Sequence, residues 1–162
     1  MVEPQRMDIS KLAPDAYRHL YALEQTVAGK IDRKLFHLLK LRASQINGCA
    51  FCIGMHSDEA LRDGDTPERL LLLDAWHESS AFTDKERAAL QWIEELTLIA
   101  DSHASEEAFD ALEQFFSVEE IAYLTLTGAL INAWNRIAIA SRGQYDRAMF
   151  QKILAGKATE PA

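Results

Sequence analysis

Apolar residues recur at intervals of three and four positions along most of this chain, the spacing that places them on one face of an α-helix. The pattern is clear in the segment that Pro14 opens and Gly29 closes, and again between Asp32 and the pair Asn47-Gly48. No stretch alternates between apolar and polar residues for long enough to predict a β-strand. The pattern therefore predicts an all-α fold.

Helix start and stop signals divide the chain into about seven helices. Thr83 with Glu86, and Ser117 with Glu120, have the spacing of capping boxes. The helix that begins after Ser117 is apolar on nearly all sides, so we expect it at the centre of the fold. Other segments predicted to be helical include residues 32–46, 49–62, 67–76, 84–100, 105–116 and 145–154.

The composition indicates one domain with a substantial core. The chain has 162 residues, of which 48% are hydrophobic. Its formal net charge of −8 argues against binding to nucleic acid, because that affinity depends on Lys and Arg contacts to phosphates. The residues closest to forming a basic cluster are expected on the solvated side of a helix: Lys30, Arg33, Lys34, Lys40 and Arg42.

The location of the protein affects how its two cysteines are interpreted. The N-terminal sequence MVEPQRMDIS has no apolar region of the kind found in signal peptides. The most apolar stretch, residues 121–131, is too short to cross a bilayer. We therefore expect a cytoplasmic protein with no membrane partner. Lasting structural disulfides are rare in that compartment, so a CxxC pair there is expected to be catalytic or metal-binding.

Cys49, Cys52 and His56 carry the candidate chemistry. Cys49 directly follows the Asn47-Gly48 stop signal and so lies at the start of the next helix. Offsets of three, four and seven residues place the three side chains on one helical face, where the two sulfurs can bond to each other. The helix N-terminus stabilises a thiolate, and a neighbouring histidine can take its proton. This arrangement predicts reversible dithiol–disulfide chemistry that needs no metal and no cofactor.

Two other interpretations of the cysteine pair stay open at this point. Zinc could be bound by Cys49, Cys52 and His56, with His37 as the fourth ligand. The cysteines could also be inert buried thiols. Attachment of haem requires a histidine directly after the second cysteine, and Ile53 stands there, which excludes that site. The remaining histidines are expected at the surface: His19, His77 and His103.

The segment LRASQINGCAFCIGMH, together with INAWNRIAIASR at residues 131–142, resembles the alkylhydroperoxidase D-like group of the carboxymuconolactone decarboxylase family. The resemblance covers roughly residues 12–150. We accordingly assign one domain to residues 12–154 and a flexible tail to residues 155–162. The resemblance implies an all-α fold that assembles into homo-oligomers, either trimers or hexamers.

The resemblance also implies roles for the site residues. The second cysteine of the pair, here Cys52, attacks the peroxide; the first, Cys49, resolves the product; and His56 belongs to a proton relay. The group usually has glutamate twelve residues before the first cysteine, and His37 stands at that position here. His37 could still relay protons, although it cannot act as an anion. Glu94 could supply a carboxylate to the relay if it faces inward.

The function implied by the resemblance is that of a thiol-dependent peroxidase in antioxidant defence, with a hydroperoxide as substrate and a dithiol or protein as reductant. The histidine at position 37 leaves a second interpretation open, a disulfide relay or redox sensor that acts on a partner protein. A third is a zinc-binding structural oligomer. Decarboxylation of a lactone ranks below these, because that branch of the family normally lacks the CxxC pair.

Overall fold

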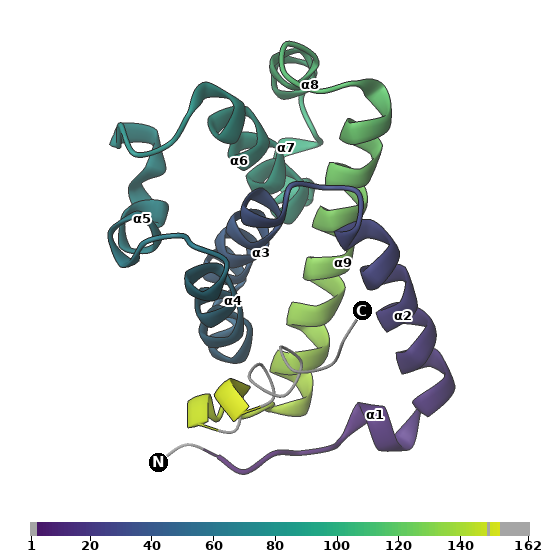
Figure 1. Cartoon of the computed structure of the whole chain (residues 1–162). Helices are drawn as coiled ribbons and strands as arrows, with labels where there is room; N and C mark the ends of the chain where they lie inside the picture. Colours follow the sequence, from purple (N-terminus) through teal and green to yellow (C-terminus); the bar gives the residue numbers. More distant parts are fainter. Residues whose placement is uncertain (1–2, 149, 153–162) are drawn as a thin grey trace.

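The computed structural model of the chain describes residues 3–148 and 150–152, whose regular structure is entirely helical (Figure 1). This confirms the predicted all-α fold. In chain order the helices are α1 (Ile9–Leu12), α2 (Pro14–Ala28), α3 (Arg33–Asn47), α4 (Ala50–Arg62), α5 (Pro67–Leu72), the 3₁₀ helix η1 (Leu73–Glu78), α6 (Asp84–Thr97), α7 (Ile99–Ser102), α8 (Glu106–Glu113) and α9 (Val118–Ser141).

The described residues contain more helices than predicted, because some are single turns and some predicted helices are broken. Leu98 leaves helical geometry (φ −101°, ψ 33°), so the helix predicted for residues 84–100 divides into α6 and α7. Ala75 likewise has non-helical angles inside η1, which follows α5 directly. The helix predicted for residues 105–116 is shorter, since α8 ends at Glu113. The breaks at Leu98 and Ala75 are not marked by glycine or proline, so the pattern of residues does not predict them.

The predicted capping signals of the longer helices are confirmed. Thr83 at the start of α6 and Ser117 at the start of α9 each accept a backbone N–H three residues on, from Glu86 and Glu120, whose carboxylates bond back to the cap. Gly48 ends α3 in the left-handed conformation, with φ of 68°, which glycine adopts without strain. This turn leads the chain directly into α4.

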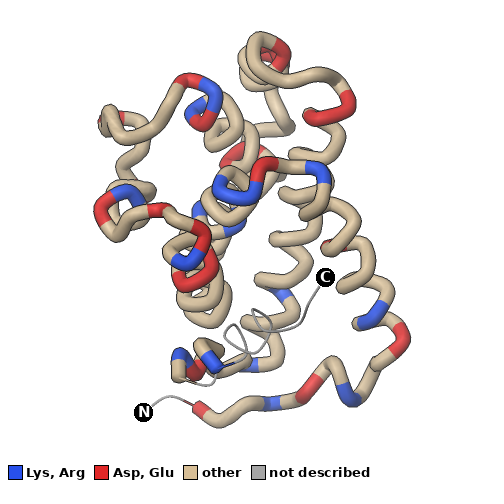
Figure 2. Tube along the Cα trace, in the orientation of Figure 1, with Lys and Arg blue, Asp and Glu red and all other residues tan. Residues whose placement is uncertain are grey.

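Helix α9 runs through the middle of the fold, as predicted (Figure 1). It contacts α2, α3, α4, α6 and α8. Its central stretch, between Glu120 and Arg136, has no charged residue, and Figure 2 shows the charges spread over the surrounding elements instead. In the view of Figure 1, α2 lies on one side of α9, and α3 to α6 lie on the other.

Side-chain amides join the C-terminal end of α3 to α9. Asn47 Nδ2 donates to Oδ1 of Asn132 and of Asn135, at 3.0 and 2.8 Å. Asn135 Nδ2 donates in turn to Ser44 Oγ at 3.0 Å. Buried polar groups need partners, so this network holds the two helices in one register. It thereby fixes the point where α4 begins, and these four residues belong to the two segments that carried the resemblance.

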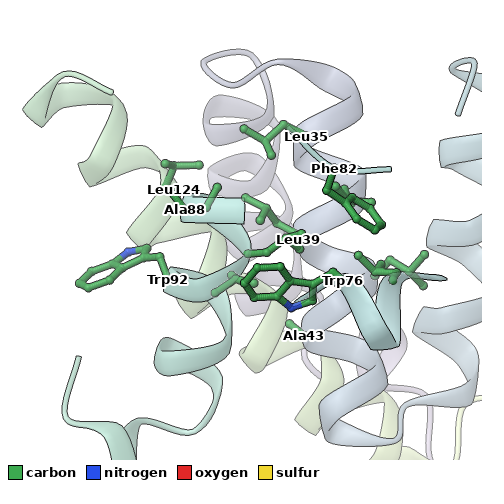
Figure 3. Close-up of a cluster of buried hydrophobic side chains, with 14 of the residues drawn as sticks. Leu35, Leu39, Ala43, Trp76, Phe82, Ala88, Trp92 and Leu124 are labelled. Carbon is green, nitrogen blue, oxygen red and sulfur yellow. The ribbon is translucent and has the colours of Figure 1, made fainter. Parts of the chain in front are cut away.

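The main hydrophobic core lies where α3, α6 and α9 meet (Figure 3). Its side chains include Leu35, Leu39 and Ala43 of α3, Ala88 and Trp92 of α6, Leu124 of α9, and Trp76 and Phe82 from the segment between α5 and α6. This core anchors the buried face of α3. The C-terminal end of α3 leads directly to the cysteines.

Arg42 and Glu94 form an ion pair. This pair corrects the prediction that Arg42 is solvated, and it shows where the carboxylate of Glu94 lies. Arg42 Nε donates to Glu94 Oε1 at 2.6 Å, and Trp76 Nε1 donates to the same oxygen at 2.7 Å. The side chain of Arg42 is only 12% exposed, so it does not belong to a solvated basic face. Glu94 does face inward, but it binds these two partners and does not line the cavity beside the cysteines that is described below.

The C-terminal helix expected at residues 145–154 begins later than predicted, with helical residues at 147–148 and 150–152. Its last two residues and the tail expected at 155–162 lie outside the described residues. Within the described part of the chain, no helix combines the length and the apolar character that crossing a membrane requires.

We expect the Gly128→Val variant to be destabilised by about 1–3 kcal/mol, the usual cost of overpacking a core. A Cβ atom at Gly128 would lie 2.6 Å from Leu96 Cδ1 and 3.1 Å from Ile93 Cδ1, closer than carbon atoms pack. Urea unfolding measures the loss. Gly29→Ala is the matched control, because a Cβ there meets only ordinary contacts at 3.7 Å and φ is −74°. Equal unfolding midpoints for the two variants would contradict this packing.

Candidate functional site

Cys49 and Cys52 form a disulfide at the N-terminus of α4, with their Cα atoms 5.3 Å apart. Cys49 is the N-cap residue of the helix, and its sulfur accepts the backbone N–H of Cys52 at 3.3 Å. The prediction that the two sulfurs can bond to each other is therefore confirmed. In this form neither cysteine offers a thiolate, so the zinc set of Cys49, Cys52, His56 and His37 is not assembled.

The disulfide is buried beside a cavity of about 750 Å³ that lies between α2, α3, α4 and α9. Cys49 is 1% exposed and Cys52 is 2% exposed. Cys52 lines the cavity, whereas Cys49 does not. A small molecule in this space can therefore reach Cys52 first, while Cys49 lies behind it.

His56 lies one turn beyond Cys52 and lines the same cavity. It is 1% exposed, and burial lowers its pKa to about 4, so the imidazole is neutral at pH 7. Its Nδ1 lies 2.8 Å from Glu59 Oε2. A carboxylate can only accept hydrogen bonds, so Nδ1 carries the proton of the neutral ring. Nε2 is then a proton acceptor, and it has no hydrogen-bond partner among the described residues.

Glu59 is the carboxylate of this site, and it was not among the residues predicted from the sequence. Burial works to raise its pKa, but the contacts with His37 and His56 outweigh burial and hold the pKa below its ordinary value. Glu59 is therefore an anion between two imidazoles. The signal that could have revealed it is its spacing of three residues from His56, which places both side chains on one face of α4.

His37 lies opposite His56, with the ring centroids 6.5 Å apart, and it lines the same cavity. Its Nε2 is 2.8 Å from Asp63 Oδ2. Burial of Asp63 favours a higher pKa, but hydrogen bonds from groups such as Arg62 outweigh burial and keep the pKa lowered, so Asp63 is an anion that accepts from His37. Nδ1 of His37 is buried, lies 3.4 Å from Glu59 Oε2, and makes no hydrogen bond with any of the described residues.

Lys40 and Glu24 form a buried ion pair in the wall of the cavity, which corrects the prediction of a solvated Lys40. Glu24 Oε2 also accepts from Trp134 Nε1 at 3.0 Å. The three residues connect α3, α2 and α9 around the cavity. Lys40 and Glu24 have opposite charges and pair with each other. The positive charge of Lys40 also adds to the lowering of the pKa of His56.

The C-terminal segment covers the outer side of α4. The ring of Tyr145 lies against Gly54, where an added Cβ would come within 2.3 Å of it. The hydroxyl of Tyr145 donates to Asp58, and Arg147 pairs with the same carboxylate. These contacts hold the C-terminal segment against the side of α4 that bears Gly54 and Asp58.

Three of the four predicted site residues, Cys52, His56 and His37, thus line one cavity, and the fourth, Cys49, is bonded to the first of them. The side chains of His37, His56 and Glu59 are also grouped closely enough to hold a metal ion, with one ligand atom from each within 4.8 Å of the others. The remaining histidines are exposed, as predicted: His19, His77 and His103.

Comparison with known proteins gives a consistent picture. The family model described as carboxymuconolactone decarboxylase family matches residues 14–95. An uncharacterised protein of Bacillus subtilis, YdfG, is 36% identical over 137 residues, which are 84% of this chain and 93% of that protein.

Solved structures show the same fold. A protein of unknown function from Agrobacterium tumefaciens, whose name connects it with the antioxidant defence protein AhpD, is 41% identical with a TM-score of 0.86. That match covers 88% of this chain and 99% of the other. The debrominase Bmp8, solved with 2,3,4-tribromopyrrole, has a TM-score of 0.74 at 20% identity, covering 90% of this chain and 78% of the other, and this similarity concerns the fold alone.

Proposed function

Because the chain belongs to the carboxymuconolactone decarboxylase family, we propose that it is a thiol-dependent peroxidase that reduces hydroperoxides through Cys49 and Cys52. One observation carries the proposal. Cys52 lines the cavity together with a neutral, buried histidine, His56, whose Nε2 is free to accept a proton. A nucleophile and its base are thus held beside a space that a small substrate can enter.

In the first step the reduced enzyme binds the hydroperoxide in the cavity. His56 Nε2 takes the proton of the Cys52 thiol, and the thiolate attacks the outer oxygen of the O–O bond. The S–O bond forms as the O–O bond breaks, which oxidises Cys52 to a sulfenic acid. The leaving alkoxide receives the proton back from His56 and departs as an alcohol. Glu59 stabilises the imidazolium that exists between the two proton transfers.

In the second step Cys49 resolves the sulfenic acid. The Cys49 sulfur attacks the sulfur of Cys52, the S–O bond breaks, and water leaves with the proton of the Cys49 thiol. The product is the disulfide that the structure contains. A dithiol reductant then returns two electrons and two protons, which restores both thiols and closes the cycle.

The burial of the sulfurs favours this function over a disulfide relay to a partner protein. Exchange with a partner protein requires a protein thiol to reach a sulfur along the S–S axis, and Cys49 and Cys52 are almost fully enclosed, whereas a small dithiol reductant can enter the cavity. A hydroperoxide, in contrast, needs only the cavity.

We also propose that the protein is a homo-oligomer, in line with the exposed apolar side chains of α7 and of the N-terminal turn of α9, Ile99 and Val118.

The experiment that tests the function is a turnover assay with an organic hydroperoxide, such as cumene hydroperoxide, and dithiothreitol as reductant. We expect many turnovers per protein, and in single-turnover conditions one hydroperoxide consumed for each disulfide formed. The matched comparison uses 2,3,4-tribromopyrrole in place of the hydroperoxide, because the debrominase shares the fold. If the reduced protein consumes hydroperoxide no faster than dithiothreitol alone, the proposed function is wrong.

A further inference from the structure

We propose that His37, His56 and Glu59 form a binding site for a divalent transition-metal ion of the zinc class, separate from the two sulfurs. The site would be complete while Cys49 and Cys52 are joined in the disulfide. It therefore differs from the thiolate zinc site that the sequence allowed.

The contact between His37 and Glu59 is the first reason. Nε2 of His37 is hydrogen-bonded to Asp63, and Nδ1 lies 3.4 Å from the Glu59 carboxylate without a hydrogen bond to any described residue. A buried ring nitrogen and a carboxylate oxygen this close together need a proton or a metal cation between them. A metal cation there would bind both atoms as ligands.

The grouping of the donor atoms is the second reason. One ligand atom from each of the three residues can be chosen so that all lie within 4.8 Å of one another. His37 is 6% exposed and His56 is 1% exposed, so the surrounding protein holds both rings in place. Two imidazoles and one carboxylate are a ligand set of zinc and related ions, with a further position left for water or substrate. Magnesium and calcium prefer oxygen ligands, so the set disfavours them.

The surroundings of His37 are the third reason. A metal-binding histidine normally donates its other ring N–H to a carboxylate, which fixes the ring orientation and the tautomer. Asp63 has this role toward His37, at 2.8 Å. The buried cation in the cavity wall, Lys40, is paired with Glu24, which reduces its repulsion of a metal ion.

Occupancy of this site would stop the peroxidase chemistry, a consequence that rests on the proposed function. If the metal binds Nε2 of His56, it consumes the lone pair that accepts the proton of Cys52. If it binds Nδ1, the neutral ring must carry its proton on Nε2. In either case His56 can no longer act as a base, so the metal and the thiol reaction compete for the same imidazole.

The test is metal binding to the oxidised, full-length protein after treatment with chelator and gel filtration. Isothermal titration with Zn²⁺ is expected to show saturable binding of one ion. Co²⁺ is expected to give visible d–d bands without thiolate-to-cobalt charge transfer, because the disulfide leaves no thiolate. Absence of Zn²⁺ binding by the oxidised wild type would overturn the site outright and would mean that a proton alone resolves the contact of His37 with Glu59.

Variants separate this site from adventitious binding. His37→Gln should weaken Zn²⁺ binding most, and Asp63→Asn should weaken it by about 10–100-fold, the usual effect of removing a carboxylate that supports a histidine ligand. The matched control is His77→Gln, which removes an exposed histidine 3.5 Å from Glu94 and should leave binding unchanged. Thermal unfolding checks that each variant is folded. Equal Zn²⁺ affinity in His37→Gln and the wild type would also overturn the proposal.

Binding and inhibition are measured separately, so the two proposals can fail independently. Zn²⁺ binding by the oxidised protein does not depend on peroxidase activity. If the protein binds Zn²⁺ but never reduces hydroperoxides, the metal site stands and the proposed function falls. If it is an active peroxidase that binds no Zn²⁺ in the disulfide form, the metal site falls alone.

Discussion

We expect the Cys52→Ser variant to lose hydroperoxide turnover completely, while the Cys49→Ser variant reacts once and then stops. Serine at position 52 presents a hydroxyl that does not ionise at neutral pH, so no nucleophile faces the cavity. Cys49 cannot substitute for it, because it does not line the cavity. In Cys49→Ser the attacking thiolate is intact, but the sulfenic acid finds no second thiol in the same molecule.

The measurement is the stoichiometry of the first turnover. Each reduced variant is mixed with limiting hydroperoxide, and the product is trapped with dimedone and examined by mass spectrometry. Cys49→Ser should carry the adduct on Cys52, and Cys52→Ser should carry none. The reverse result, with an adduct on Cys49, would exchange the roles of the two cysteines and contradict their placement relative to the cavity.

The second large effect is expected at His56. Replacement by glutamine removes the proton acceptor, and loss of a positioned general base typically lowers a rate by about 10²–10⁴-fold. Glu59→Gln should have a smaller effect in the same direction. Its amide oxygen can still accept Nδ1–H of His56, but it no longer stabilises the imidazolium with a negative charge.

The pH dependence of the thiol reaction distinguishes a catalytic from a merely structural role. Above the pKa of the Cys52 thiol, hydroxide in solution removes the proton, and the deficit of His56→Gln should shrink toward the wild-type rate. Stopped-flow measurement of thiol oxidation at several pH values gives this profile. His77→Gln is again the matched control and should retain the full rate at every pH. A deficit in His56→Gln that stays constant with pH would assign His56 to packing and not to proton transfer.

The parts of the fold that the sequence predicted are those decided by local contacts. The capping boxes at Thr83 and Ser117 each involve residues only three apart, and they form as expected. Gly48 ends α3 because its own backbone conformation allows it. The pairing of Cys49 with Cys52 follows from spacing on one helix for the same reason.

The parts that the sequence did not predict depend on partners that are distant along the chain. Lys40 was predicted to be solvated, but the packing of α2 places Glu24, sixteen residues earlier in the chain, beside it. Arg42 is likewise drawn inward by Glu94, 52 residues later. Glu59 is a different case. It lies three residues from His56 on the same helix, but the carboxylate of the site was predicted at position 94 instead.

Both sulfurs are almost completely enclosed, which limits how fast they equilibrate with other thiols in a cell. The redox state of a thiol pair at equilibrium is set by the ambient potential, but the approach to equilibrium depends on access. With 1% and 2% of Cys49 and Cys52 exposed, the surrounding pool of small thiols exchanges with the pair only through the cavity. We therefore expect slow equilibration with thiols that are too bulky for the cavity, so that the oxidation state of the pair follows the hydroperoxides and reductants that can enter it.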